Sequence, residues 1–255
     1  MKILAITQAR IGSTRLPEKI LKKVNGQTLL EIHLKRILKS ERITKLKVAT
    51  TTEPGVDKIL KIAADLKIEV YQGSINNVLE RFYKAAEQEN PDWIVRLTSD
   101  CPLIDPVEID KVIDFAVEKN LDYASNTLKP TFPDGIDVEV FKYSALEKAY
   151  KNAKLNSEIE HVTPYIWKNS SYNGGNLFSS DCVINDIDYS DIRLTVDTIH
   201  DLEVIKKLIE IESINKRWID YVYALNKNPE IKKINMKFER NEGYTKSIEK
   251  DIQNG

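Results

Sequence analysis

The first 120 residues alternate between short apolar segments typical of β-strands and longer segments in which apolar residues recur at helical spacing. Strands are predicted at residues 2–7, 45–50, 68–71 and 93–98. A helix is predicted after each of them, at residues 28–39, 56–66, 78–88 and 106–118. Because parallel strands need crossover connections, this order predicts an α/β fold with a mostly parallel sheet and helices on both faces.

The alternation weakens after residue 120. Strands are predicted there at residues 122–127, 138–141, 173–178 and 192–196. Helices are predicted at residues 143–150, 158–168, 201–211 and 218–225. The segment from residue 228 is polar and charged, and we expect an extended arm. No linker or internal repeat divides the chain, so we expect one domain over residues 1–235 and an arm over 236–255.

A basic loop at residues 9–19 follows the first predicted strand. It combines three cations, two hydroxyls and one glycine, which are Arg10, Arg15, Lys19, Ser13, Thr14 and Gly12. Guanidinium, ammonium, hydroxyl and backbone N–H groups bind phosphate, and a glycine lets the backbone approach an anion. The spacing matches neither a Walker loop nor a dinucleotide fingerprint. Because open α/β sheets bind ligands at the carboxyl ends of their strands, we interpret the loop as a polyphosphate site rather than a solvated basic loop.

Two aspartates end predicted strands on either side of the chain's middle. Asp100 follows the strand at residues 93–98, and Asp197 follows the strand at residues 192–196. Magnesium is commonly held by one or two carboxylates together with phosphate oxygens. Opposite a cationic loop, this pair suits phosphoryl transfer. Asp197 taken alone is equally a helix cap, and capping is the better interpretation of Asp105.

The segment at residues 73–81 also follows a predicted strand, and a nucleobase is a candidate ligand there. Gly73 and Asn77 would contact the base, and Arg81 would reach a phosphate or ribose. Ser74 is predicted to cap the helix that follows.

Two polar motifs in the middle of the chain are candidates for an acceptor pocket. Strand alternation places Asp137 and Glu139 on one face, which is unusual for a core. Glu160 and His161 lie in a dense polar and aromatic segment. Surface charge explains both motifs equally well, and Glu160 and His161 suit a subunit interface too.

Composition excludes several classes of protein. The net charge of −1 gives no sign of a nucleic-acid partner. Cys101 and Cys182 are the only cysteines, and their spacing indicates neither a disulfide framework nor a zinc site. The first apolar run is too short for a signal peptide, and no segment is apolar over the length of a membrane span. We therefore expect a cytoplasmic protein without a membrane partner.

Several motifs together resemble one family. They lie at residues 8–17, 49–51, 78–83, 96–105, 125–127, 133–141, 160–165, 194–197 and 240–247. The loop at residues 9–19 is similar to the nucleotide loop of cytidylyltransferases that activate sugar acids, such as the synthetases of CMP-Kdo and CMP-sialic acids. The fuller match is to the branch of the spore coat polysaccharide biosynthesis protein F (SpsF). Glu18 and Ser99 stand where these motifs usually have glycine.

The resemblance implies a Rossmann-like nucleotidyltransferase fold of GT-A type with a small substrate and dimerisation lobe. Residues 1–120 would form the nucleotide-binding half and residues 121–198 the acceptor and dimerisation half. It implies CTP as the donor, Mg²⁺ as the cofactor and a homodimer. The acceptor would be a sugar acid, a sugar phosphate or an alditol phosphate, activated for cell-surface polysaccharide synthesis.

The resemblance also assigns residues to roles. Arg10, Arg15 and Lys19 would bind and activate the triphosphate, while Asp100 and Asp197 would hold the metal. The matched motifs add Ala9 and Thr51 to the nucleotide site, and Asn126 and Asp134 to the acceptor site.

Two alternative functions remain open at this point. One is a nucleotide-sugar glycosyltransferase, whose Asp-x-Asp spacing occurs at Asp186 and Asp188. The other is a nucleotide-binding relative without catalytic activity.

Overall fold

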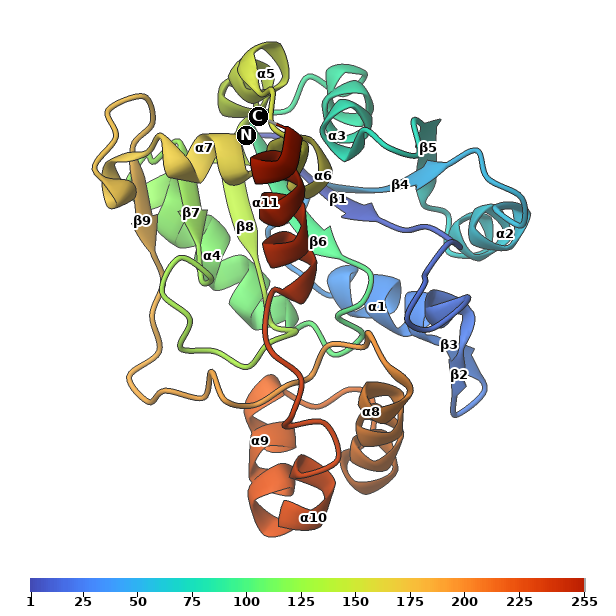
Figure 1. The fold of residues 1–255 in the computed structure, drawn as a ribbon. Helices are drawn as coiled ribbons and strands as arrows, with labels where there is room; N and C mark the ends of the chain where they lie inside the picture. The colour runs from blue at the N-terminus through green and yellow to red at the C-terminus, as the bar shows by residue number, and fades with distance from the viewer. Residues whose placement is uncertain (255) are drawn as a thin grey trace.

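The computed structural model describes residues 1–254 and contains a seven-stranded mixed sheet (Figure 1). The strands, in order across the sheet, are β5 (Glu69–Gly73), β4 (Lys45–Thr51), β1 (Ile3–Gln8), β6 (Trp93–Thr98), β8 (Glu139–Lys142), β7 (Tyr123–Ser125) and β9 (Ser180–Cys182). The first four are parallel, β8 is antiparallel to both of its neighbours, and β9 is parallel to β7. The predicted α/β class with a mostly parallel mixed sheet is confirmed.

Alternate residues of the central strand β1 face two hydrophobic cores. Ile3 and Ala5 belong to the core with helices α1 (Leu29–Ile37), α2 (Asp57–Asp65), α4 (Pro106–Glu118), α8 (Ile199–Glu212) and α9 (Trp218–Lys227). Leu4 and Ile6 belong to the core with α3 (Val78–Glu87), α5 (Tyr143–Asn152) and α7 (Pro164–Lys168). Both faces of the sheet are thus covered, which explains why β1 is a continuous apolar run.

Shorter elements complete the described chain. They are η1 (Lys19–Leu21), β2 (Lys23–Val24), β3 (Gln27–Thr28), α6 (Asn156–His161), η2 (Ser171–Asn173), α10 (Pro229–Lys232) and α11 (Glu242–Asn254). No helix in residues 1–254 combines the length and apolar character needed to cross a membrane.

Local side-chain contacts determine where the helices begin. The Asp105 carboxylate accepts a hydrogen bond from the Val107 amide at the start of α4, as predicted. The cap of α3 was predicted at the wrong residue: the Asn77 side chain, rather than Ser74, accepts from the Glu80 amide at 2.8 Å. The Ser74 hydroxyl instead accepts from the Asn77 amide at 3.1 Å.

The topology creates a switch point between β1 and β6. The chain passes from β1 to β4 and β5 on one side, and then returns to β6 on the other side of β1. The connections after β1 and β6 therefore diverge, and a crevice opens between them at the carboxyl ends of these strands. The loop at residues 9–19 and Asp100 lie on either side of it.

Three predictions for the second half are wrong. Residues 158–168 form two short helices, because Val162 adopts a φ of 72° and Pro164 cannot continue a helix. Residues 173–178 are not a strand, and β9 forms later in the chain. Residues 192–196 are not a strand either. Arg193 forms one isolated bridge with Asp134, and the amides of Ile192 and Val196 donate to carbonyls in loops.

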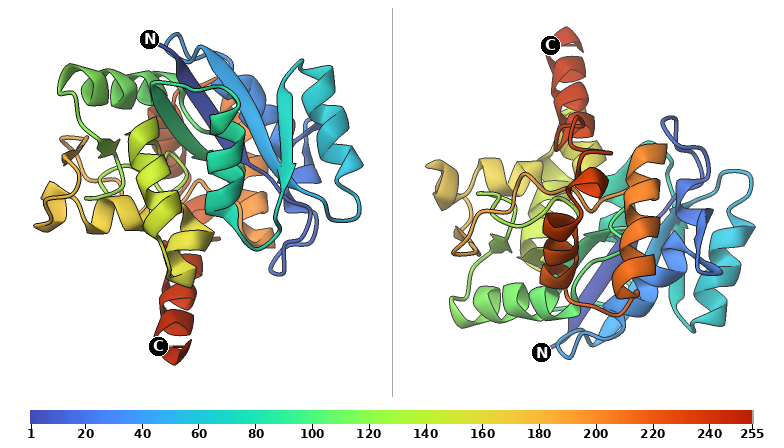
Figure 2. Two further views of the ribbon diagram at one scale, coloured as in Figure 1. Left: turned by 90° about the horizontal axis from the view of Figure 1, so that it is seen from above. Right: turned by 90° about the horizontal axis from the view of Figure 1, so that it is seen from below.

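The tail is helical rather than extended. Its last helix, α11, packs against α6, and the Asp251 carboxylate accepts hydrogen bonds from the Ser157 amide at 3.2 and 3.3 Å. Figure 2 shows the C-terminal end of α11 projecting away from the rest of the fold. The polar composition of the tail thus reflects a helix with one face docked and the other in solvent.

Candidate active site

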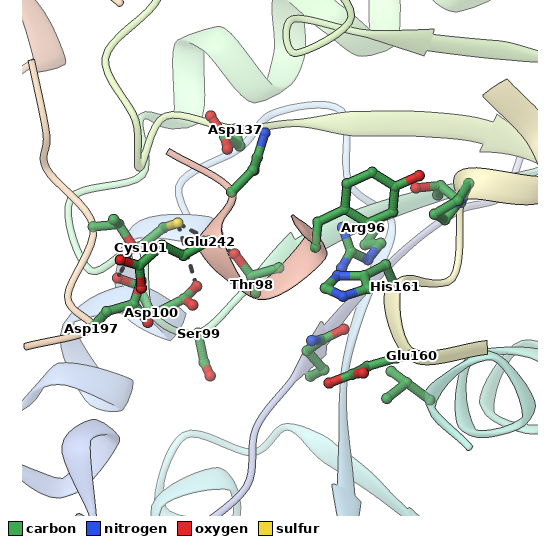
Figure 3. Close-up of a pocket in the computed structure, with 18 of the residues that line it drawn as sticks. Arg96, Thr98, Ser99, Asp100, Cys101, Asp137, Glu160, His161, Asp197 and Glu242 are labelled. Atoms are coloured by element: carbon green, nitrogen blue, oxygen red, sulfur yellow. Dashed lines mark hydrogen bonds between the residues drawn. The ribbon is translucent and has the colours of Figure 1, made fainter. Parts of the chain in front are cut away.

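A cavity of about 920 Å³ opens at the switch point. The loops after β1 and β6 line it, together with α6 and the start of α11. In Figure 3, Asp100, Asp197 and Glu242 lie at one end of this cavity, while Arg96, Glu160 and His161 lie at the other. We call these the donor end and the acceptor end.

The floor of the cavity is one face of the sheet. On this face the strands carry apolar side chains toward one end, including Leu4, Ile94 and Phe141, which belong to the buried core. Two residues further along, the same face of β6 carries Arg96, and Glu139 pairs with it across the ladder on β8. A change from apolar to polar residues along one face thus marks where the core ends and the cavity begins.

Lys19 joins the two aspartates at the donor end. Its ammonium nitrogen lies 2.8 Å from Oδ1 of Asp197 and 3.3 Å from Oδ2 of Asp100. Burial disfavours the charged ammonium, but the attraction of both carboxylates outweighs it and raises the pKa of Lys19. Burial likewise acts to raise the pKa of Asp100, and Lys19 holds it below its usual range. Both aspartates therefore share one cation.

Arg15 and Arg193 complete the donor end. Arg15 pairs with Asp197 at 2.9 Å and with Glu242 at 2.8 Å. Arg193 pairs with Asp134 at 2.6 Å, Asp197 at 3.0 Å and Asp201 at 2.9 Å. Arg193 thus holds Oδ2 of Asp197, while Lys19 contacts Oδ1.

Arg193 was not predicted from the sequence. An available signal was its position among apolar residues, four before Asp197, where a charged side chain needs partners.

Glu53 occupies two backbone amides of the basic loop. Its Oε1 accepts hydrogen bonds from the amides of Ile11 at 2.8 Å and Gly12 at 3.2 Å, and from the Thr51 hydroxyl at 2.9 Å. A Cβ atom at Gly12 would lie 2.8 Å from Glu53 Oε2. In this structure the amides of Ile11 and Gly12 are bound by the protein's own Glu53 carboxylate, and the phosphate-binding role of Gly12 stays a prediction.

The acceptor end holds a hydrogen-bonded network around Glu139. This carboxylate pairs with Arg96 and accepts hydrogen bonds from the Tyr123 hydroxyl at 2.7 Å and the Thr163 hydroxyl at 2.5 Å. His161 lies nearby, where burial and the positive charge of Arg96 lower its pKa to about 4. The imidazole is thus neutral at pH 7.

The C-terminal segment contributes to both ends. Ser247 on α11 donates a hydrogen bond to Glu160 at 2.8 Å, and its hydroxyl lies 3.0 Å from Nε2 of His161. Arg240 pairs with Asp137, and burial raises the pKa of Asp137 against the attraction of Arg240. These contacts join segments about 90 residues apart, so local sequence patterns gave no sign of them.

Most of the predicted site residues line the cavity. They are Ala9, Arg10, Gly12, Ser13, Arg15, Lys19, Arg81, Asp100, Asp134, Asp137, Glu139, Glu160, His161 and Asp197. Arg81 is almost fully buried and donates to the backbone carbonyls of Ser74 and Ile75.

Four predicted site residues do not line the cavity, and they are Thr51, Gly73, Asn77 and Asn126. Thr51 is bound to Glu53, and Asn77 caps α3. The Asn126 side chain donates to the Ile136 carbonyl at 2.7 Å and accepts from the Val138 amide at 2.9 Å. These side chains stabilise the walls of the site from behind.

Asp100 and Asp197 are the residues that could hold a metal ion at the donor end, together with oxygens of a bound substrate. Within residues 1–254, no group of three or more His, Cys, Asp and Glu side chains is placed to hold a metal. Asp100 and Asp197 nevertheless contact one cation together, the Lys19 ammonium. Two carboxylates completed by phosphate oxygens are a common magnesium site.

The Asp-x-Asp spacing at Asp186 and Asp188 is not part of this site. Both residues are exposed and lie outside the cavity.

Comparison with known proteins places the chain among nucleotidyltransferases. A family model described as cytidylyltransferase matches residues 4–236. The chain is 39% identical over 241 residues to the uncharacterized protein MJ1063 of Methanocaldococcus jannaschii, covering 92% of this chain and 95% of that protein. It is 33% identical over 235 residues to the spore coat polysaccharide biosynthesis protein SpsF of Bacillus subtilis, covering 89% and 95%.

Two solved structures share the fold. A cytidylyltransferase from Leptospira borgpetersenii superposes with a TM-score of 0.86 at 36% identity and covers 94% of this chain and 100% of its own. A CMP:2-keto-3-deoxy-manno-octonic acid synthetase in complex with CTP superposes with a TM-score of 0.61 at 15% identity and covers 83% and 100%. The second similarity concerns the fold alone.

Proposed function

This chain belongs to the cytidylyltransferase family, and we propose that it transfers CMP from CTP to a sugar acid and releases pyrophosphate. The observation that carries the proposal is the position of Lys19 between Asp100 and Asp197 in the switch-point crevice. This arrangement places cations and carboxylates together where a triphosphate and its metal would bind. The similarity to SpsF supports a role in polysaccharide synthesis.

The proposed reaction is an in-line displacement at phosphorus. An oxygen of the acceptor forms a bond to the α-phosphorus of CTP, and the bond from this phosphorus to the bridging oxygen of the β-phosphate breaks. Pyrophosphate leaves with that electron pair. Lys19 and Arg15, with Arg10 at the rim of the cavity, would hold the phosphates and stabilise the charge that develops on them.

Asp100 and Asp197 would hold Mg²⁺ together with the phosphates. When bound, the ion would neutralise phosphate charge and help to orient the reacting groups. Lys19 would then exchange its carboxylate partners for phosphate oxygens, a change that its flexible chain permits. Arg193 would keep Asp197 oriented during this exchange, because two other carboxylates, those of Asp134 and Asp201, fix its guanidinium.

A pyrophosphate-release assay tests the proposed function. The enzyme would be incubated with Mg²⁺ and each of CTP, UTP, ATP and GTP, together with 3-deoxy-manno-octulosonate and other sugar acids. We expect release with CTP and one sugar acid, and none without the acid. In a parallel incubation with nucleotide sugars, release of a nucleoside diphosphate would instead indicate a glycosyltransferase. CTP binding without turnover on any acceptor would indicate a non-catalytic relative.

A further inference from the structure

The cavity wall contains buried polar atoms that have no hydrogen-bond partner among residues 1–254. They include Nε of Arg96, the hydroxyl of Tyr244 and Oε1 of Gln8, and all three residues line the cavity. Leaving a buried donor or acceptor unpaired costs about 1–3 kcal/mol. Nearly all such groups in folded proteins have partners. A ligand that supplies the missing partners explains why these atoms lie together in one cavity.

Arg96 is fixed in a way that leaves part of its guanidinium available. It lies on β6 directly opposite Glu139 on β8, and Nη1 pairs with that carboxylate. Glu139 is itself held by the Tyr123 and Thr163 hydroxyls, so its position is set from two other elements. The ion pair therefore orients Arg96 and does not use its Nε–H. An oriented guanidinium with a free N–H edge suits a carboxylate ligand.

Tyr244 reaches the acceptor end because α11 is docked on α6. Its ring packs edge-on against His161 at 5.2 Å and against Trp167 at 5.9 Å between ring centroids. Ser247, one turn further along α11, binds Glu160 and contacts His161. Figure 1 shows α11 beside α6, in front of the sheet. The start of this helix is thus one wall of the acceptor end, and the Tyr244 hydroxyl is a group of that wall.

Nε of Arg81 is a fourth unpaired atom of the cavity lining. The groups of Arg96, Tyr244 and Gln8 specify a ligand by their hydrogen-bonding character. Nε–H of Arg96 can only donate, so it needs an acceptor, and the Tyr244 hydroxyl can donate to the same anionic group. Oε1 of Gln8 can only accept, so it needs a donor such as a hydroxyl. Lys250 also lines the cavity, and the Lys168 ammonium lies 5.8 Å from the Tyr244 ring centroid. The carboxylates of Glu139 and Glu160 line the same end, so the preference for an anion rests on the unpaired donors rather than on the net charge of the wall.

We propose that Arg96 and Tyr244 bind the carboxylate of a polyhydroxylated acid and that Gln8 accepts a hydrogen bond from one of its hydroxyls. The C-terminal helix then completes the acceptor site. This inference rests on the proposed function and names the chemical group by which the acceptor is recognised. Glu139 acts through Arg96 and is a positioning residue.

Calorimetric binding and pyrophosphate release test the inference separately. The full chain would be titrated with 3-deoxy-manno-octulosonate, gluconate, glucose 6-phosphate and glucose. CDP would be present to fill the nucleotide site, because it lacks the third phosphate and so cannot yield pyrophosphate. We expect at least one of the two acids to bind and glucose not to bind. We expect Tyr244→Phe to weaken binding of the acid about tenfold and Arg96→Lys to weaken it at least about tenfold, the range for one lost neutral or charge-assisted hydrogen bond.

Tyr223→Phe is the matched control, because this tyrosine is exposed on α9 and lies outside the cavity. In turnover with the acid, Tyr244→Phe should raise the KM for the acid and leave the KM for CTP unchanged. The inference is overturned if glucose 6-phosphate binds and neither acid does, if no acid binds at all, or if both variants bind the acid as well as the wild type. Acid binding that the variants weaken, without pyrophosphate release, would reject the proposed function and retain the carboxylate site.

Discussion

The ammonium nitrogen of Lys19 lies 2.8 Å from Oδ1 of Asp197, although 178 residues separate them in the chain. Lys19 belongs to the basic loop after β1, and Asp197 to the segment before α8. A residue predicted to bind phosphate and a residue predicted to bind metal therefore neutralise each other in this structure. A metal-bound triphosphate would separate them and provide each with a new partner of opposite charge.

Lys19→Ala should reduce pyrophosphate release about 10²- to 10³-fold, the range for removing one group that stabilises developing charge. The variant should remain folded, because Arg15 and Arg193 still pair with Asp197. Release would be measured under saturating CTP, with far-UV circular dichroism as the test of folding. Lys23→Ala, at an exposed position four residues away, is the control. A rate close to that of the wild type would exclude this role of Lys19.

Arg193→Met should destabilise the protein by about 3–5 kcal/mol, the range for removing one partner of a buried ion pair and leaving the other. The substitution leaves Asp134 and Asp201 buried without their arginine. Urea unfolding would measure the change. Arg42→Ala, which removes an ion pair with Asp114 on the surface, should change stability far less. Equal effects of the two substitutions would show that the network around Arg193 contributes little.

The local chemistry of the donor end is visible in the sequence. The basic loop and Asp100 directly follow strands whose apolar runs identify them, because parallel strands buried on both faces contain few polar residues. Their carboxyl ends meet at one edge of the sheet, and this brought Lys19 and Asp100 together in the prediction as in the structure.

The long-range contacts at both ends of the cavity could not be predicted to the same extent. Arg193 and Tyr244 reach the site through ion pairs and helix packing between distant segments, which no periodicity encodes. The polar tail gave the wrong expectation because α11 needs α6 to pack against. Nothing local to the loop indicates Glu53, which reaches the amides of Ile11 and Gly12 from the turn after β4.

His33 makes stability depend on pH between about 6.5 and 4. Burial lowers its pKa from 6.5 to about 4, and the ring is hydrogen-bonded to Thr7 and to the Cys101 carbonyl. The unfolded chain binds a proton in this range that the folded chain does not bind. Stability from this residue is therefore complete above pH 6.5 and is lost as the pH falls toward 4, by roughly 3 kcal/mol.

The pH dependence can be assigned by substitution. The free energy of unfolding would be measured by urea titration at intervals from pH 7.5 to 4. His33→Gln should lower stability at pH 7 and flatten its dependence on pH. His161 titrates in the same range, so a residual slope is expected in His33→Gln. An unchanged slope in that variant would contradict the assignment to His33.

Gly12→Ala should raise the KM for CTP, because its Cβ would displace the Glu53 carboxylate that holds the loop amides. A steric cause of this kind predicts non-additivity. In Gly12→Ala with Glu53→Ala, the methyl group has no carboxylate to displace, so the double variant should bind CTP no worse than Glu53→Ala alone. The four KM values form a double-mutant cycle. Additive losses would show that Gly12 is required for direct approach of the triphosphate instead.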